Sequence, residues 1–209
     1  SRTNKTNLRK HKRFKYVDQA LRKLPKDTIY VISTPPSTHF ALIKKLTKKV
    51  RNIIVEKPIF THPNQVIAFK KFYFNKSVII KEIFMYRYSL MFKKSISLIK
   101  KEYNHIDKIE CNFVIPSNPN NSFRDEKKIE SSCLYDIGSY IFDYFVTLNF
   151  KLHSFKIIKK NYIDGKLYNM YFSFKLGNIN VYSQIGINQT YKNNLIINTK
   201  DGKEVHFNA

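Results

Sequence analysis

Thr28-Ile-Tyr-Val-Ile-Ser-Thr-Pro-Pro-Ser-Thr-His39 and, further along the chain, Ile54-Val-Glu-Lys-Pro58 are the two stretches that decide the fold. Each begins with a short apolar run rich in β-branched residues, which is typical of a strand buried on both faces of a parallel sheet. Each run ends at prolines, which stop the strand and turn the chain out of the sheet. Between them, Thr38 to Val50 has apolar residues at helical spacing, so the order predicts strand, helix and strand.

The flanking segments extend this order in both directions. Tyr16 to Leu24 has helical spacing and ends at Pro25, Pro63 to Phe74 predicts another helix, and Val78 to Ile83 predicts a third buried strand. Strands alternating with helices at this spacing are typical of a doubly wound α/β sheet with right-handed crossovers. We therefore expect residues 1–87 to form a first domain of this kind.

The pattern changes after Tyr88, where an α+β domain is expected over residues 88–209. A helix is predicted from Leu90 to Lys101, and a strand from Ile106 to Ile115. An exposed loop follows at Pro116 to Glu126, and a second helix around Cys133 to Leu148. The remainder contains strand-like segments separated by turn signals, which predict antiparallel hairpins. These signals are Asp164-Gly165, Gly177-Asn178 and Asp201-Gly202.

The composition limits the classes of function. A formal net charge of +23 favours a polyanionic partner, either a nucleic acid or an anionic membrane surface. However, the lysines are spread along the whole chain, and Lys, Asn, Ile, Tyr and Phe are abundant while Trp is absent. AT-rich codons favour such residues, so a genomic bias explains the charge without selection for binding. We prefer this explanation, and binding of nucleic acid is not expected.

The lack of a recognisable targeting signal and the spacing of the cysteines predict a cytoplasmic protein. No apolar run reaches the roughly 18 residues that span a bilayer, and the basic N-terminus precedes no secretory apolar segment. Cys111 and Cys133 lie far apart without a Cys-x-x-Cys spacing, so reduced thiols in a cytoplasmic protein are expected. The chain does not begin with Met, which suggests a processed or incomplete chain. The histidines have no metal-ligand spacing with one another or with the cysteines, so no metal is expected.

The candidate chemistry lies where the predicted strands end. Ligands of open parallel sheets bind at the carboxyl ends of the strands, where Thr34-Pro35 and Glu56-Lys57 converge. Lys57 is a candidate proton donor or acceptor, because partial burial lowers the pKa of an ammonium towards the working range. Glu56 beside it could hold the lysine in place. A second candidate segment, Tyr135-Asp-Ile-Gly-Ser-Tyr140, lies at or near the start of a helix in the second domain.

Together these segments resemble the glucose-fructose oxidoreductase/inositol dehydrogenase (Gfo/Idh/MocA) family, from about Lys15 to Gly202. The resemblance implies a Rossmann domain followed by an α+β domain with a large, mostly antiparallel sheet. It implies that Lys57 acts in catalysis next to the nicotinamide. It further implies that Asp136 and Tyr140 supply an acidic residue and a proton relay near the substrate. Arg87, in the segment that enters the second domain, is implied to contact the substrate.

The resemblance also implies a nicotinamide cofactor, either NAD or NADP. Its expected neighbours are Arg2, Thr34, Pro35, His39, Glu56 and Lys57. Ser1-Arg2-Thr3 resembles the segment that follows the second Rossmann strand, where an arginine often meets the 2′-phosphate of NADP, so NADP is slightly favoured. The family's Gly-x-Gly-x-x-Gly segment is missing, because the first of the 5 glycines is Gly138. We therefore expect a partial Rossmann domain without its first strand, Gly-rich loop and helix.

Each candidate residue also has a simpler structural interpretation. His39 could be a structural residue, Asp136 an acid at a helix N-terminus, and Tyr140 one packing tyrosine among 14. Arg87 could pair with a carboxylate or the backbone at the domain junction. Arg2 could belong to a frayed terminus.

Three functions remain open on the sequence alone. The first is an NAD(P)-dependent dehydrogenase or reductase acting on CH–OH groups of a sugar, sugar nucleotide or polyol, if the full-length chain carries the missing N-terminus. The second is an inactive, truncated remnant that serves as a binding or scaffold protein. The third is a basic nucleic-acid-binding protein, for which the chain has no recognised motif. By resemblance, a homo-oligomer through the open face of the C-terminal sheet is expected.

Overall fold

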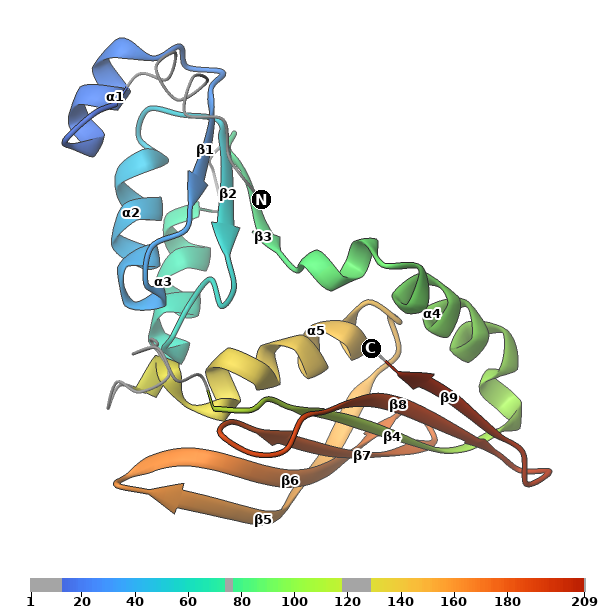
Figure 1. The fold of residues 1–209 in the computed structure, drawn as a ribbon. Coiled ribbons are helices and arrows are strands. Elements are labelled where there is room, and N and C mark those ends of the chain that lie inside the picture. The colour runs from blue at the N-terminus through green and yellow to red at the C-terminus, as the bar shows by residue number, and fades with distance from the viewer. Residues whose placement is uncertain (1–12, 74–76, 118–128, 209) are drawn as a thin grey trace, which may run out of the picture.

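The computed structural model describes residues 13–73, 77–117 and 129–208, which fold around two separate sheets (Figure 1). Arg2 lies outside the described residues, as does most of the predicted loop from Pro116 to Glu126. The two sheets match the two fold classes expected from the sequence, namely a parallel Rossmann-type sheet and a larger, mostly antiparallel one.

The first sheet is parallel, with the strand order β1-β2-β3. Its strands are β1 (Ile29–Ile32), β2 (Asn52–Glu56) and β3 (Ile79–Ile83). The helices of this region are α1 (Val17–Lys23), η2 (Pro36–Thr38), α2 (His39–Leu46) and α3 (Pro63–Tyr73). Helix α2 connects β1 to β2, and α3 connects β2 to β3, so the predicted order of strands and helices is confirmed.

The expectation that all three strands are buried on both faces is wrong. Ile29, Val31 and Ile79 have 59%, 60% and 57% of their surface exposed, whereas Ile53 and Val55 of the central strand are buried. The crossovers α2 and α3 step in the same direction along the sheet, so their right-handed connections bring both helices to one face (Figure 1). Among the described residues, no helix covers the opposite face. The described part of the sheet therefore has helices on one face, where a doubly wound sheet has them on both.

The second sheet has six strands in the order β5-β6-β7-β4-β8-β9. The strands are β4 (Ile106–Val114), β5 (Leu152–Ile163), β6 (Lys166–Leu176), β7 (Ile179–Gly186), β8 (Lys192–Thr199) and β9 (Glu204–Asn208). Among them, β4 and β7 pair in parallel, and the other neighbouring strands pair antiparallel. The predicted turns Asp164-Gly165, Gly177-Asn178 and Asp201-Gly202 connect the hairpins. Their glycines have φ of +78°, +58° and +84°, a region that glycine enters without steric cost.

The helical segments of the second region lie between β3 and β5 along the chain. They are η3 (Met85–Tyr88), α4 (Leu90–Glu102), η4 (Tyr103–His105), η6 (Ile129–Ser131), η7 (Leu134–Gly138) and α5 (Ser139–Val146). The helix predicted from Cys133 to Leu148 is present, but it begins as a π-helical turn, η7, before continuing as α5. The predicted domain boundary between residues 87 and 88 falls within η3 and stays a prediction.

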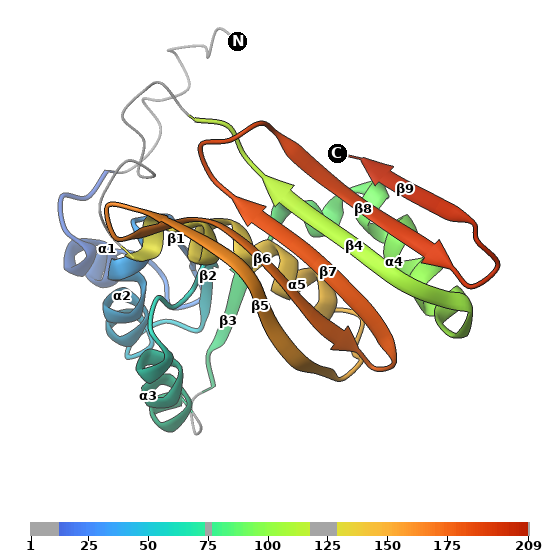
Figure 2. The ribbon, with the colours of Figure 1, turned by 90° about the horizontal axis from the view of Figure 1, so that it is seen from below.

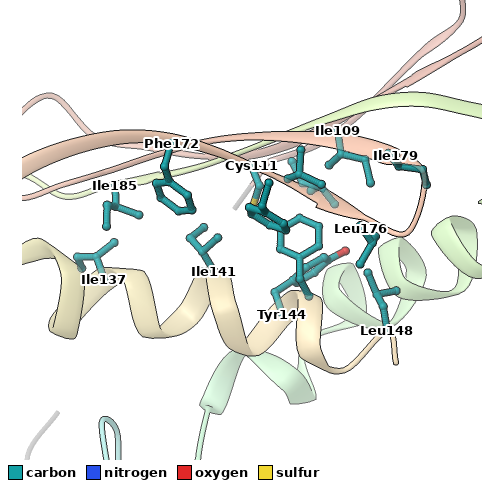
Figure 3. Close-up of a cluster of buried hydrophobic side chains, with 14 of the residues drawn as sticks. Ile109, Cys111, Ile137, Ile141, Tyr144, Leu148, Phe172, Leu176, Ile179 and Ile185 are labelled. Carbon is teal, nitrogen blue, oxygen red and sulfur yellow. The ribbon is translucent and has the colours of Figure 1, made fainter. Parts of the chain in front are cut away.

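The main core lies between α5 and the six-stranded sheet. Ile137, Ile141, Tyr144 and Leu148 recur at helical spacing and point towards the sheet, as Figure 3 shows. On the sheet side they meet buried residues from β4, β6 and β7, among them Ile109, Cys111, Phe172, Leu176, Ile179 and Ile185. Figure 2 shows that α4 and α5 lie on the same face of this sheet, while its other face carries no described helix. Packing on this face positions α5, and with it Asp136 and Tyr140, beside the first sheet.

Candidate functional site

Lys57 lies directly after β2, at the carboxyl edge of the parallel sheet, and the peptide bond between Lys57 and Pro58 is cis. Its ammonium nitrogen, Nζ, donates hydrogen bonds to the side-chain Oδ1 and the main-chain oxygen of Asp136, both at 2.6 Å. The two side chains are only 13% and 8% exposed, so water screens the ion pair weakly. Lys57 and Asp136 are 79 positions apart in the sequence, so this contact joins the two sheets of the molecule.

Asp136 owes its position to the π-helical turn η7. It is buried, lies in the middle of that turn, and donates its main-chain N–H to the oxygen of Ser132 at 3.0 Å. Its main-chain oxygen accepts from Lys57 Nζ at 2.6 Å and from the Ser139 hydroxyl at 3.4 Å. Asp136 therefore offers Lys57 both a charge and a fixed main-chain acceptor.

Tyr140 completes the group from the first turn of α5. Its ring lies over the Lys57 ammonium, with 4.5 Å between Nζ and the ring centroid, which is a cation–π distance. Three further rings surround it at centroid distances of 5.3 to 5.7 Å. They belong to Phe84, Tyr86 and Phe113. Lys57 thus contacts both Asp136 and Tyr140, the other two residues that the sequence analysis predicted as catalytic; the catalytic role of all three stays a prediction.

The residues predicted to contact the cofactor lie at the ends of β1 and β2. The hydroxyls of Thr34 and Thr38 are 2.6 Å apart, and Thr38 Oγ1 also donates to the main-chain oxygen of Pro35 at 2.8 Å. These contacts fix the loop that follows β1. Glu56 is the last residue of β2 and is half-buried.

His39 connects the two strand-end loops. It is completely buried, with Nε2 at 2.7 Å from the main-chain oxygen of Thr34 and Nδ1 at 3.0 Å from that of Pro58. Because both ring nitrogens face carbonyl oxygens of the protein, the side chain fixes the spacing of the two loops. This arrangement agrees with the structural interpretation of His39, and its contact with a cofactor stays a prediction.

Arg87, predicted to contact the substrate, pairs with Asp143 of α5. Its Nε donates to Asp143 Oδ2 at 2.8 Å, and its Nη2 contacts Asp143 Oδ1. Tyr86 donates its hydroxyl to the same Oδ2 at 2.6 Å. This is the domain-junction pairing considered above for Arg87. The side chain of Arg87 remains 41% exposed, and its contact with a substrate stays a prediction.

Two carboxylates in this region were not singled out from the sequence, Asp143 and Glu82. Glu82, on β3, accepts a hydrogen bond from the main-chain N–H of Ile59 at 2.8 Å and so supports the loop that carries Lys57. Burial raises the pKa of Glu82 above its usual range, although the Ile59 hydrogen bond lowers it in part. A single carboxylate inside the apolar run from Val78 to Ile83 was the available signal.

A cavity of about 440 Å³ opens beside Tyr140, between α4, α5 and the six-stranded sheet. Its described walls include the rings of Tyr86, Phe113 and Tyr140 and the amide of Asn193, and none of them is a Lys, Arg, Asp or Glu side chain. Burial raises the pKa values of Tyr86 and Tyr144, and it raises that of Cys111 to about 12, so these walls stay uncharged near neutral pH. Tyr140 therefore forms part of the wall of an uncharged cavity.

The described residues were searched for metal-binding groups and for helices that could span a membrane. Within residues 13–73, 77–117 and 129–208, no group of three or more His, Cys, Asp or Glu side chains is arranged to hold a metal ion. No helix in these ranges combines the length and apolar character that crossing a membrane requires.

Part of the chain matches a known protein family. Residues 4–83 match a family model described as an oxidoreductase family with an NAD-binding Rossmann fold, named GFO_IDH_MocA. Over these residues the chain is similar to that oxidoreductase family, in agreement with the resemblance seen in the sequence. Among curated proteins, none matches the chain significantly.

Solved structures of this fold resemble the chain over most of its length. Myo-inositol 2-dehydrogenase from Lactobacillus plantarum has a TM-score of 0.78 at 14% identity, over 92% of this chain and 60% of that one. Apo scyllo-inositol dehydrogenase from Lactobacillus casei has a TM-score of 0.74 at 16% identity, over 92% and 59%. A 3-ketoreductase from Actinomadura kijaniata, in complex with NADP and TDP-benzene, has a TM-score of 0.73 at 15% identity, over 88% and 58%. At these identities the likeness establishes the fold, and the chain spans about three fifths of the length of these proteins.

Proposed function

We propose that this chain forms the substrate-facing part of an NAD(P)-dependent oxidoreductase that acts on CH–OH groups of a sugar, sugar nucleotide or polyol. The observation that carries the proposal is the position of Lys57, whose ammonium lies against both the Asp136 carboxylate and the Tyr140 ring. These residues come from a sheet edge, a π-helical turn and an α-helix. Most lysines of the described residues are exposed, whereas the side chain of Lys57 is only 13% exposed, and charged groups held in this way cluster at functional sites.

The three side chains have distinct roles in this proposal. An ammonium has three N–H donors, and Lys57 gives two of them to Asp136, which leaves one for the oxygen of a substrate. Asp136 holds the ammonium in place and orients the substrate. Tyr140 and Lys57 together take the hydroxyl proton when the alcohol is oxidised and return it when the carbonyl is reduced.

The strand-end residues fit the nicotinamide end of a dinucleotide. Thr34, Pro35, Glu56 and Lys57 line the carboxyl edge of the parallel sheet, where open α/β sheets bind ligands. His39 fixes the spacing of the two loops that carry them. A pyrophosphate needs the close backbone approach that glycine permits, and no glycine precedes Gly138, so these loops fit the nicotinamide end alone. When bound, the cofactor would accept or supply the hydride that balances the proton handled by Tyr140 and Lys57.

The similar structures and the cavity bear on the cofactor type and the substrate class. We propose NAD or NADP, with NADP slightly favoured through Arg2 and through the NADP complex of the similar 3-ketoreductase. The two inositol dehydrogenases of the same fold support a polyol as substrate. The uncharged walls of the cavity beside Tyr140 agree with such a neutral ligand.

We also propose that two copies of the chain associate through the open face of the six-stranded sheet. On that face the half-exposed side chains Ile158, Tyr171 and Tyr182 lie together beside a shallow hollow. Burial of these rings in a partner would remove apolar surface from water, which favours association. Sedimentation velocity over a range of concentrations tests this, and a monomer at every concentration would contradict it.

Titration with NADPH and with NADH, followed by the fluorescence of the reduced nicotinamide, tests the proposed function. We expect saturable binding, and reduction of NADP⁺ or NAD⁺ in the presence of myo-inositol or another polyol of a panel. Binding of neither cofactor would contradict the oxidoreductase and favour the binding or scaffold alternative. A steep salt dependence of DNA or RNA binding would instead support the third, nucleic-acid-binding function.

A further inference from the structure

The position of Tyr140 depends on a short segment that is remote in the sequence. Two of the three rings around it, Phe84 and Tyr86, belong to the stretch that leaves β3 and forms η3. The third, Phe113, belongs to β4. The ring that covers Lys57 is therefore packed largely against the segment that forms η3.

Asp143 holds these two elements together. It lies three residues after Tyr140 on α5, so both side chains share the face of the helix that meets η3. Its carboxylate accepts from the Tyr86 hydroxyl and from the Arg87 guanidinium, and it is only 10% exposed. Charge-assisted hydrogen bonds of this kind are roughly twice as strong as neutral ones, and their geometry is specific.

The contact also reaches the rings directly. The guanidinium carbon of Arg87 lies 5.6 Å from the centroid of the Phe84 ring, which in turn packs edge-on against Tyr140. The Tyr86 hydroxyl lies 3.4 Å from the main-chain oxygen of Tyr140. Burial and the Asp143 carboxylate raise the pKa of Tyr86, and Asp143 raises that of Arg87, so both remain donors at ordinary pH.

We propose that Asp143 is a positioning residue of the site: through Tyr86 and Arg87 it holds the Tyr140 ring over the Lys57 ammonium. This inference rests on the proposed function for its catalytic meaning, but the positioning itself can be measured without turnover. In this proposal Arg87 helps to hold Asp143 in place.

Chemical labelling of Lys57 tests the proposal. The protein is exposed briefly to acetic anhydride, and the rate of acetylation at Lys57 is read by peptide mass spectrometry. We expect Asp143→Asn to raise this rate about two- to fivefold, which corresponds to loss of a cation–π contact of about 0.5–1 kcal/mol. Asp18→Asn is the matched control, because it removes a carboxylate that pairs with Lys45 on the exposed surface. It should leave the rate at Lys57 unchanged.

A double-mutant cycle separates positioning from general loosening of the fold. Tyr140→Ala alone should raise the labelling of Lys57, and adding Asp143→Asn to it should cause no further rise, because both changes act through the same ring. If Asp143→Asn does not fold, Arg87→Gln removes the partner whose side chain is 41% exposed and should give the same increase. An unchanged labelling rate in a folded Asp143→Asn or Arg87→Gln variant, or additive effects in the cycle, would overturn the proposal. The presence or absence of turnover affects neither outcome.

Discussion

The three-stranded sheet and the six-stranded sheet differ in how much of their apolar surface is covered. In the six-stranded sheet, α5 packs along one face and buries side chains from β4, β6 and β7. In the three-stranded sheet, α2 and α3 cover one face, while Ile29, Val31 and Ile79 are exposed on the other. The free energy gained by hydrophobic burial scales with the apolar area removed from water. The second region is therefore expected to contribute more to the stability of the fold.

This difference explains where the site lies. Lys57 comes from the less buried region, but the side chains that fix it, Asp136 and Tyr140, come from the helix that is anchored in the larger core. The geometry at Lys57 is therefore set by the second region as much as by its own strand. If the two regions differ in this way, substitutions in them should differ in their effect on stability.

Removal of a large side chain should be most destabilising in the core of the second region. Phe145 is fully buried and packs against Tyr144 and Phe174, so Phe145→Ala should lower the free energy of unfolding by about 3–5 kcal/mol. Phe69 of α3 is only half-buried beside Phe60 and Tyr73, so Phe69→Ala should have a clearly smaller effect. Urea unfolding measures both, and equal losses would contradict the difference between the regions.

The ion pair between the two regions should show the next effect. Asp136→Ala removes the carboxylate that pairs with Lys57, whose side chain is only 13% exposed in the unchanged protein, and should lower the free energy of unfolding by about 3 kcal/mol. The double variant Lys57→Met/Asp136→Leu removes both charges and should recover most of that stability. Urea unfolding of the single and double variants tests this, and a double variant as unstable as the single one would disagree with it.

Ionisation of Glu82 should make the free energy of unfolding depend on pH, with a smaller effect than loss of the ion pair. Its pKa in the folded protein is raised above the ordinary value of 4.5, mainly by burial. A group whose pKa is raised by folding stabilises the fold at pH values below its ordinary pKa. This contribution is lost as the pH rises through the raised pKa of the folded protein. Glu82→Gln should therefore gain stability relative to the unchanged protein as the pH is raised from 4 towards 7. Urea midpoints at several pH values would show this, and a constant difference would refute the proposed burial of the charge.

The smallest effect is expected on the exposed face of the first sheet. Val31→Thr should change the free energy of unfolding by less than about 0.5 kcal/mol, because the side chain is 60% exposed. Val181→Thr, at a fully buried position of β7, is the matched change and should cost about 1–3 kcal/mol. If both substitutions were equally costly, the face that carries Val31 would be covered in solution.

Much of the fold could be predicted from the sequence because it depends on local pattern. The β-branched runs at Thr28 to Ser33 and Val78 to Ile83 gave the parallel strands, and glycine turns such as Asp164-Gly165 gave the hairpins. Burial of Val31 was predicted wrongly, because it depends on which face the crossover helices occupy. The π-helical turn at Asp136 was also missed, since one extra residue in a turn hardly alters helical periodicity.

The candidate site was predictable in part for the same reason. Lys57, Asp136 and Tyr140 lie in short motifs, and the contacts of Lys57 with the other two agree with the resemblance, which implied that all three lie near the substrate. Asp143 and Glu82 were not singled out, because their roles depend on partners 56 and 23 positions away, Arg87 and Ile59. Pairings over such distances leave no periodic trace in one sequence.

The central claim is that Lys57 acts in catalysis, and the turnover of Lys57→Met tests it most directly. Polyol-dependent reduction of NADP⁺ should fall at least about 100-fold, the contribution expected of a positioned proton-transfer group. Lys48→Met, which removes an exposed lysine of the same region, is the control and should keep full turnover. If Lys57→Met reduced NADP⁺ as fast as Lys48→Met, Lys57 would not be the catalytic residue of this site.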